Sequence, residues 1–208
     1  MSLIRQRYLG DSVAGGWSWL DPYHASMPLT NPDPALTDPK VTLRPWSSHD
    51  LSCVEEASLD PDISTGTTVP QTYTPEAGLA FIERQHARLT SGEGLALAIA
   101  ETASNEAVGH VNLLYRPQRG VVGIGYWLLE RRRGNRLGLH AVRLHSRWAL
   151  QDAKLDRIEA FVEPSNGASI GVLKGAGFQR EGLLRAYLAF DTRRADVFIY
   201  SLLPTDIR

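Results

Sequence analysis

The sequence of 208 residues contains a single cysteine and no long apolar run. One cysteine, Cys53, cannot form an intramolecular disulfide, and no run approaches the roughly 20 apolar residues that span a bilayer. The first ten residues, MSLIRQRYLG, also lack the apolar core of a secretory signal. These absences argue against a membrane-embedded protein and predict a cytoplasmic one.

An excess of charge of one sign is missing as well, because 22 basic and 23 acidic residues leave a formal net charge of -1. Nucleic acid is therefore not an expected partner, since non-specific binding to phosphate backbones needs a basic surface. The composition, with 43% hydrophobic and 22% charged residues, is typical of a globular protein. At this length we expect one domain with a substantial core and room for a small appendage.

Grouped metal ligands are also absent from the sequence. Cys53 lies in the helical pattern SHDLSCVEEASL, where a small buried side chain is the expected role. His140 and His145 do not have the i, i+4 spacing of a metal-binding pair on a helix. We therefore predict no metal site.

Residues 1–40 differ from the rest of the chain. They carry Trp17, Trp19 and Tyr23, followed by the stretch MPLTNPDPALTDPK, whose prolines exclude a regular helix. Neighbouring tryptophans are costly to leave in water, so we expect this N-terminal arm to dock on the domain or on a second subunit of a homodimer. A disordered tail is the alternative. The domain itself is expected to span residues 41–208.

Strand and helix patterns alternate along this domain, which predicts a mixed α/β (α+β) fold. β-Branched and aromatic runs predict strands over residues 41–46, 95–102, 107–116, 120–130, 156–163, 179–189 and 195–203. Helical spacing and capping residues predict helices over about 47–59, 74–89, 134–153 and 166–177. In the longest helix, an apolar stripe of Leu137, Ala141, Leu144 and Trp148 is expected to pack on the sheet.

The segment YWLLERRRGNRLGLHAVRL joins a predicted strand to this helix through a glycine-containing turn. A helix N-terminus presents unpaired N–H groups and a positive dipole end, which suit a phosphate or pyrophosphate. Gly134 and Gly138 let the backbone approach such a ligand, and Arg133 and Arg136 add positive charge. GIGYWL does not open a helix as a dinucleotide fingerprint does, and GNRLGL lacks the lysine of a P-loop. A nucleotide-binding oxidoreductase is therefore not supported.

Three segments in this order, GYWLLERRRGNRLGLHAV, RIEAFVEPSNGAS and SIGVLKGAGFQREGLLR, resemble the GNAT acyltransferases. The resemblance extends from about Val41 to Leu203 and includes the branch of ribosomal-protein N-terminal acetyltransferases of the RimJ/RimL type. It implies a mixed, mostly antiparallel central sheet, flanked by helices, whose fourth and fifth strands splay apart. It also implies an acyl-CoA cosubstrate, acetyl-CoA by default, whose pantetheine lies in the gap.

The same resemblance implies a set of cofactor-binding residues. Backbone groups of three successive strand residues would contact the pantetheine, the turn after them would hold the pyrophosphate, and an Asn-x-x-Ser pair would lie near the thiol. The residues are Trp127, Leu128, Leu129, Arg133, Gly134, Asn135, Arg136, Leu137, Gly138, Leu139, Asn166 and Ser169. Arg136 replaces a usual glycine and His140 a usual acid, but the backbone N–H groups of the turn are still expected to bind the pyrophosphate.

The chain departs from the family most at Gly123, where many relatives carry a glutamate suited to act as a general base. For the proton donor to the departing thiolate, we expect Ser169 and, second, Tyr187, although helix capping and core packing are their alternatives. For the base, Glu163 and His110 are candidates, either directly or through a water. A strand N–H near Leu128 would stabilise the oxyanion.

The sequence thus predicts an enzyme that transfers an acetyl or other short acyl group, such as succinyl, from acyl-CoA to a primary amine. The amine belongs to a small molecule or a protein N-terminus. An α-amino group, with a pKa of roughly 8, needs less help than a lysine-type amine of roughly 10.4, and the absence of an acid at Gly123 favours the former. A catalytically weak CoA-binding regulator or sensor is the alternative.

Overall fold

The computed structural model describes residues 29–189 and 193–207. The arm residues Trp17, Trp19 and Tyr23 lie outside these ranges. The described end of the arm contacts the domain, because Leu29 is buried and its N–H donates to the hydroxyl of Tyr115 at 2.8 Å. Within the described residues, no helix has the length and apolar character needed to cross a membrane.

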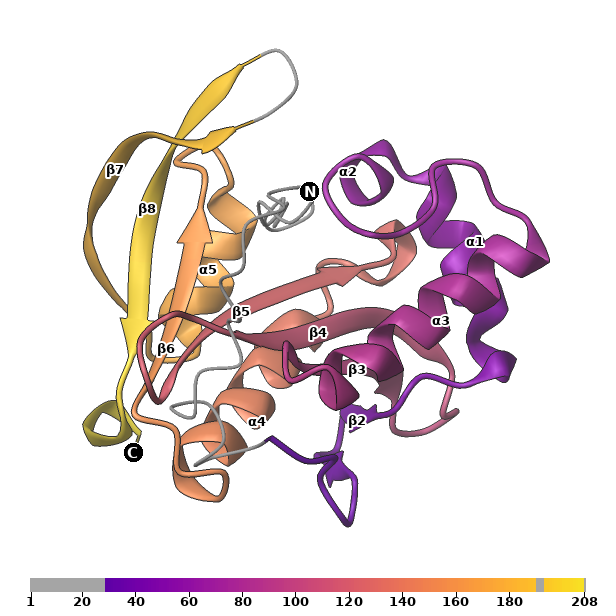
Figure 1. The fold of residues 1–208 in the computed structure, drawn as a ribbon, viewed down its shortest axis with the longest axis horizontal. Helices are drawn as coiled ribbons and strands as arrows, with labels where there is room; N and C mark the ends of the chain where they lie inside the picture. Colours follow the sequence, from indigo (N-terminus) through magenta and orange to yellow (C-terminus); the bar gives the residue numbers. More distant parts are fainter. Residues whose placement is uncertain (1–28, 190–192, 208) are drawn as a thin grey trace, which may run out of the picture.

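One mixed sheet forms the centre of the fold, with the strand order β1-β2-β3-β4-β5-β6-β8-β7 (Figure 1). Neighbouring strands are antiparallel except for β5 and β6. The strands are β1 (Leu36–Thr37), β2 (Val41–Arg44), β3 (Gly94–Glu101), β4 (Ala107–Tyr115), β5 (Val121–Leu128), β6 (Arg157–Val162), β7 (Gln179–Ala189) and β8 (Arg194–Leu202). The expected mixed, mostly antiparallel sheet is confirmed.

β5 and β6, the fourth and fifth strands of the predicted set, diverge after a short paired segment. Their parallel pairing ends at Gly123 and Glu159, whereas β5 continues to Leu128. Beyond that point β6 pairs with β8 alone, through residues up to Val162. In Figure 1, β6, β8 and β7 stand as an upright group that turns away from β3, β4 and β5. The predicted splay is therefore confirmed, and a gap opens along the free edge of β5.

Helices cover both faces of the sheet and divide the core into two clusters. The helices are α1 (Leu51–Leu59), α2 (Pro61–Ser64), α3 (Pro75–Thr90), α4 (Leu137–Gln151) and α5 (Gly167–Gly175). Trp46, Phe81 and Trp127 belong to the cluster beneath α1 and α3. Ile124 and Leu173 belong to the cluster beneath α4 and α5. Alternate residues of β5 thus face opposite layers, as a strand requires.

Local capping explains where two of the helices begin. The Thr74 hydroxyl accepts a hydrogen bond from the Ala77 N–H at 3.1 Å, and Pro75 occupies the first turn of α3, as the sequence predicted. Asp60 caps α2 in the same way, by accepting from the Asp62 N–H at 2.9 Å. α2 was not among the predicted helices, because a helix of one turn has too few residues to show a period.

The structure corrects the start and the buried face of the longest helix. α4 begins at Leu137 and not at Gly134, because Gly134 and Arg136 have φ angles of 82° and 63°, outside the helical region. Its buried face includes His145, whereas Trp148 is only partly buried. Cys53 is buried within α1 as predicted, and burial raises the pKa of its thiol.

Candidate active site

A cavity of about 370 Å³ lies between the free edge of β5, the N-terminus of α4 and the first turns of α5. Its wall combines aromatic and aliphatic side chains with two arginines and three glycines. The lining residues are Tyr126, Trp127, Leu128, Arg133, Gly134, Arg136, Leu137, Gly138, Leu139, Ala168, Ser169, Gly171 and Val172. Most of the predicted cofactor residues therefore surround one space.

Three of the predicted residues do not line the cavity. Leu129 is buried in the cluster beneath α1 and α3, and its N–H donates to the Val108 carbonyl at 2.9 Å. Asn135 is exposed on the turn. Asn166 is buried at the N-cap of α5, where its Oδ1 accepts from the Ser169 N–H at 3.2 Å. Asn166 thus positions Ser169, which does line the cavity.

The turn before α4 points backbone N–H groups at the mouth of the cavity. Gly134 and Arg136 both have left-handed φ angles, and α4 starts directly after them. The N–H of His140 makes the first bond of the helix, to the Arg136 carbonyl at 3.1 Å, so the amides of residues 137–139 precede the intrahelical ladder. Such amides and the helix dipole bind anionic phosphates. The arginines at the same mouth add to this preference.

The left-handed conformation of Arg136 yields a stability prediction. A left-handed non-glycine residue costs roughly 1 kcal/mol, so Arg136→Gly is expected to raise the melting temperature by about 2–4 °C. Gly134→Ala is the matched reverse change: its φ is 82° and an added Cβ would meet no atom within 4 Å, so only strain is introduced. Differential scanning calorimetry should show a lower melting temperature for Gly134→Ala. Equal shifts of both variants in one direction would contradict the assignment.

Hydrogen bonding along β5 determines which peptide groups face the gap. Leu129 donates to Val108 of β4, and the regular β4–β5 register turns every second residue toward β4. The peptide groups of Tyr126 and Leu128 therefore point to the opposite side, into the gap. The Leu128 carbonyl accepts a hydrogen bond from Arg133 Nε at 3.1 Å. Leu128 thus offers both a donor and an acceptor at the cavity wall.

The three consecutive arginines after β5 have different partners. Arg131 pairs with Glu56 at 2.9 Å and with Glu106 at 2.7 Å on the surface. Arg132 joins the same acidic group through Glu106 at 3.2 Å. Arg133 instead lines the cavity and forms an ion pair with Asp60, the N-cap of α2. Arg133 therefore connects the turn before α4 to the helices on the other face.

Two hydroxyl groups meet inside the cavity. The Tyr126 hydroxyl donates to Ser169 Oγ at 3.5 Å, and both side chains are buried. Burial raises the pKa of the Tyr126 phenol, so it remains protonated and keeps its donor role. Ser169 Oγ is then free to direct its own proton into the cavity. The sequence analysis missed Tyr126, whose position within a strand gave no sign that it would meet the serine.

The other predicted catalytic residues lie outside this cavity. Glu163 follows β6 and pairs with Arg193 at 3.0 Å. Tyr187 is 47% exposed and stacks on Phe161, with ring centroids 5.1 Å apart. His110 is fully buried on β4, where burial lowers its pKa to about 3. The structure thus brings Ser169, and none of the other three, to the cavity wall.

The space that a side chain at position 123 would occupy is filled by Arg116, which directly follows β4. A Cβ on Gly123 would lie 2.4 Å from Nη2 of Arg116, so the guanidinium occupies the space of that side chain. Arg116 lies 3.8 Å from Glu159, the register partner of Gly123 on β6, and 4.9 Å from the centre of the Phe161 ring. A carboxylate is therefore present on the adjacent strand. Sequence analysis missed it because the pairing of β5 with β6 was unknown.

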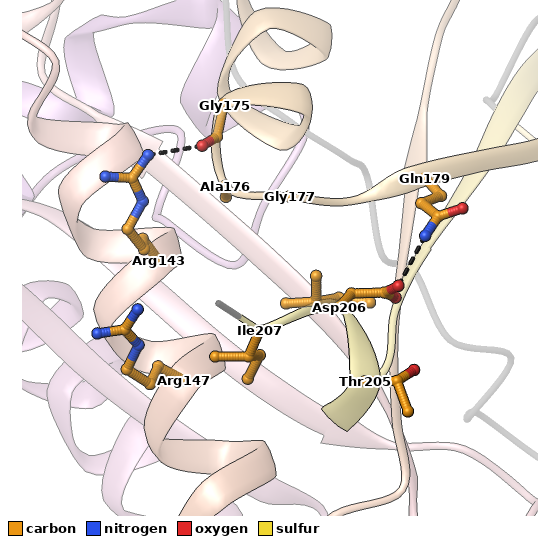
Figure 2. Close-up of a pocket in the computed structure, with 10 residues that line it drawn as sticks. Arg143, Arg147, Gly175, Ala176, Gly177, Gln179, Thr205, Asp206 and Ile207 are labelled. Atoms are coloured by element: carbon orange, nitrogen blue, oxygen red, sulfur yellow. Dashed lines mark hydrogen bonds between the residues drawn. The ribbon is translucent and has the colours of Figure 1, made fainter.

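Figure 2 shows a second hollow of about 570 Å³ between α4, the end of α5 and the C-terminal segment. Its polar groups bond to each other across the hollow. Arg143 donates to the Gly175 carbonyl at 2.6 Å, and Asp206 accepts from Gln179 at 2.6 Å. The first of these bonds joins α4 to α5, and the second joins the C-terminal segment to the start of β7, so both hold elements of the fold together.

The described residues contain no group of three or more His, Cys, Asp or Glu side chains arranged to hold a metal ion. The cavity beside β5 instead suits a long ligand with a phosphate-bearing end. Its mouth carries arginines and backbone N–H groups, and its wall carries Tyr126, Leu128 and Val172.

A sheet split between β5 and β6, with an anion-binding helix N-terminus at the mouth of the gap, defines a coenzyme A-dependent acyltransferase of the GNAT fold. The sequence profile described as "Acetyltransferase (GNAT) domain" matches residues 40–179. The chain belongs to this family. It is an N-acyltransferase, and acetyl-CoA is the cosubstrate of the family.

Curated relatives and solved structures agree with this assignment. "Uncharacterized N-acetyltransferase p20" of Bacillus licheniformis is 27% identical over 168 residues, which cover 80% of this chain and 94% of that protein. "Probable N-acetyltransferase YjcK" of Bacillus subtilis strain 168 is 32% identical over 136 residues, 64% of this chain and 75% of that protein. RimJ of Mycobacterium smegmatis, solved with a CoA disulfide, shares the fold with a TM-score of 0.70 at 24% identity, covering 80% of this chain and 83% of RimJ.

Proposed function

We propose that the cavity beside β5 binds the acyl-CoA, with the pyrophosphate at the N-terminus of α4 and the pantetheine along Leu128. The main observation in support of this proposal is that the free edge of β5 and the first turn of α4 line one cavity of about 370 Å³. Arg133 and Arg136 then lie beside the phosphates. The gap between β5 and β6 admits the acyl group from one side and the amine from the other.

Two groups of the chain are suited to the chemical step. The Leu128 N–H points into the gap, where it donates to the carbonyl oxygen as negative charge develops on it. Ser169 lies on the opposite wall and supplies a proton to the departing thiolate, while Tyr126 holds the serine oxygen from behind. In this scheme Glu163 and Tyr187, which lie outside the cavity, affect the acceptor side.

The acceptor that fits best is an α-amino group, either of a small molecule or of a protein N-terminus. Gly123 provides no carboxylate of its own, and Glu159 beside it is held by Arg157 at 3.0 Å. An amine with a pKa of roughly 8 is partly neutral at physiological pH and needs little assistance from a base. This preference agrees with the RimJ/RimL-type resemblance of the sequence.

A pair of glycine substitutions on α5 tests the location of the acyl-CoA. Gly171 lines the cavity and an added Cβ would meet no atom within 4 Å, so the side chain of Gly171→Leu starts in open space beside the proposed ligand. We expect this variant to weaken CoA binding at least about tenfold, or ~1.4 kcal/mol, in titration calorimetry. Gly167→Leu is the control, because Gly167 is equally unobstructed but lies outside the cavity lining. Equal affinities of the two variants would contradict the proposed location.

The alternative function, a CoA-binding regulator that does not turn over, rests on the missing acid at Gly123. Thiol release from acetyl-CoA in the presence of amines, peptides and aminoglycosides separates the two functions. Turnover on any acceptor favours the enzyme, whereas thermal stabilisation by CoA without turnover on all of them favours the regulator. The presence of Glu159 and Ser169 around the gap supports the enzyme.

We also propose a cytoplasmic location, which is consistent with the single cysteine, and we expect no binding to nucleic acid. We further propose that the protein forms a homodimer in which the N-terminal arm takes part. Leu183 and Tyr187 on the edge strand β7 are large exposed side chains that support a contact between copies. Truncation of residues 1–40 followed by light scattering measures whether the arm is required for association.

A further inference from the structure

At two glycines, β5 presents no side chain on the sheet face that we propose meets the acceptor. Gly123 and Gly125 both face away from α4, on the side of Trp127. The space over Gly123 holds the guanidinium of Arg116, and the space over Gly125 holds the amide of Asn112, whose outer atom lies 3.0 Å from where a Cβ would be. Side chains of β4 and the turn after it therefore form this part of the floor.

The orientation of the Asn112 amide is determined by a buried histidine. Trp46 Nε1 can only donate, and it lies 3.2 Å from His110 Nδ1, which must therefore accept. Burial keeps His110 neutral, because it lowers its pKa to about 3, so the proton of the ring is on Nε2. The Asn112 amide lies 3.2 Å from Nε2. Since Nε2 donates, the amide must present its oxygen to His110.

This orientation directs the NH2 group of Asn112 toward the space over Gly125. The outer amide atom is buried, and no donor group of the described residues bonds to it, as expected if it is the NH2 group. An NH2 group only donates, so a ligand oxygen at this place would accept a hydrogen bond from it. The amide also lies directly across from Gly125, two residues beyond the last β5–β6 pair, where the gap begins.

We propose that Asn112 is a specificity-determining residue, whose NH2 donates to a carbonyl oxygen of the acceptor next to the reacting amine. His110 is the residue that positions it. This inference rests on the proposed function, since it assumes that the amine enters on this side of the gap. The substrate class it predicts is an α-amino amide, the group found at the start of a peptide, in preference to an amine without a carbonyl.

The charges around this place favour a neutral oxygen over a carboxylate. Arg116 lies 3.8 Å from Glu159, and Arg157 is 3.0 Å from Glu159 and 2.5 Å from Glu181. Two arginines thus face two glutamates, which leaves the cluster without net charge. A carboxylate on the acceptor would gain little here, whereas a carbonyl oxygen needs only the single donor of Asn112.

The test compares two acceptors of similar amine pKa, alaninamide and propargylamine, of which only the first has a carbonyl beside the amine. Thiol release from acetyl-CoA gives kcat/KM for each. Wild-type protein should prefer alaninamide, and Asn112→Asp, which keeps an oxygen toward His110 but replaces the NH2 by oxygen, should reduce that preference about 10- to 100-fold. Asn112→Leu should reduce it without adding charge. His110→Phe should give a smaller reduction, mainly in KM.

Asn105→Asp is the control, because it makes the same chemical change at an exposed position outside the gap. Its ratio should equal that of the wild type. If both Asn112 variants turn over with the wild-type ratio, or the wild type shows no preference, the inference is overturned and the proposed function stands. If the wild-type protein neither binds CoA nor releases thiol with any amine, both fail.

Discussion

Replacing Ser169 by alanine is expected to lower kcat by about 10²- to 10⁴-fold, the usual contribution of a positioned proton donor. The Ser169 hydroxyl is buried in the cavity wall and accepts a hydrogen bond from Tyr126 at 3.5 Å. The backbone N–H of Ser169 donates to Asn166, which holds the residue in place. Alanine keeps the helix and its cap at Asn166 but removes the hydroxyl that we propose passes a proton to the sulfur. CoA affinity should stay within about threefold, since the turn at α4 is unchanged.

Two variants distinguish catalysis from structure in this experiment. Ser165→Ala changes an exposed serine of the same loop and should leave kcat unaltered. Tyr126→Phe keeps the ring in the core but removes the hydroxyl behind Ser169, so a smaller loss of kcat is expected. Steady-state kinetics with acetyl-CoA, together with calorimetric CoA titration, provide the two readouts. Wild-type kcat in Ser169→Ala would show that the serine hydroxyl takes no part in the chemical step.

Folding stability is expected to fall steeply in mild acid because of two buried histidines. Burial lowers the pKa of both His110 and His145 from 6.5 to about 3. The unfolded chain therefore binds two protons below pH 6.5 that the folded protein does not, so the stabilisation is complete above 6.5 and is lost as the pH falls toward 3. Each histidine contributes about 1.4 kcal/mol per pH unit in this window. Between pH 6.5 and 5 the combined loss is roughly 4 kcal/mol, a large part of a typical total stability.

Urea unfolding at pH 5, 6 and 7 measures this slope. His145→Leu should remove about half of it and raise stability at every pH, since both ring nitrogens of His145 are buried without a hydrogen-bond partner among residues 29–189 and 193–207. His49→Ala, at an exposed position, is the control and should keep the wild-type slope. A His145→Leu variant with an unchanged slope would show that His145 does not titrate on unfolding.

The sequence predicted most of the fold because each element carries a local pattern. Alternating or β-branched runs marked the strands, and the cap at Thr74 marked the start of α3. The turn that we propose binds the pyrophosphate was also marked in the sequence, since Gly134 and the arginines lie directly between a strand and an amphipathic helix. The short elements β1 and α2 were not predicted, because they contain too few residues for a periodic pattern to appear.

The parts of the site that the sequence did not predict depend on contacts between distant segments. Tyr126 and Ser169 meet because the start of α5 lies beside the cavity along β5, and Glu159 lies next to Gly123 because of one strand register. Leu129 was included with Trp127 and Leu128 because a motif gives the same weight to successive residues. The alternation of a strand, in contrast, points successive peptide groups to opposite sides, and it turns the Leu129 N–H to β4.

Because Gly123 and Gly125 have no side chains, β5 does not itself form the surface that we propose meets the acceptor. In the proposed arrangement, the edge of β5 binds the cosubstrate, while β4 and the turn after it form the surface that meets the acceptor. Natural variation or laboratory selection at Asn112 and Arg116 can therefore retune which amine is accepted without disturbing the strand that holds the donor. A small number of substitutions on β4 would then change the acceptor preference while the affinity for the acyl donor stays the same.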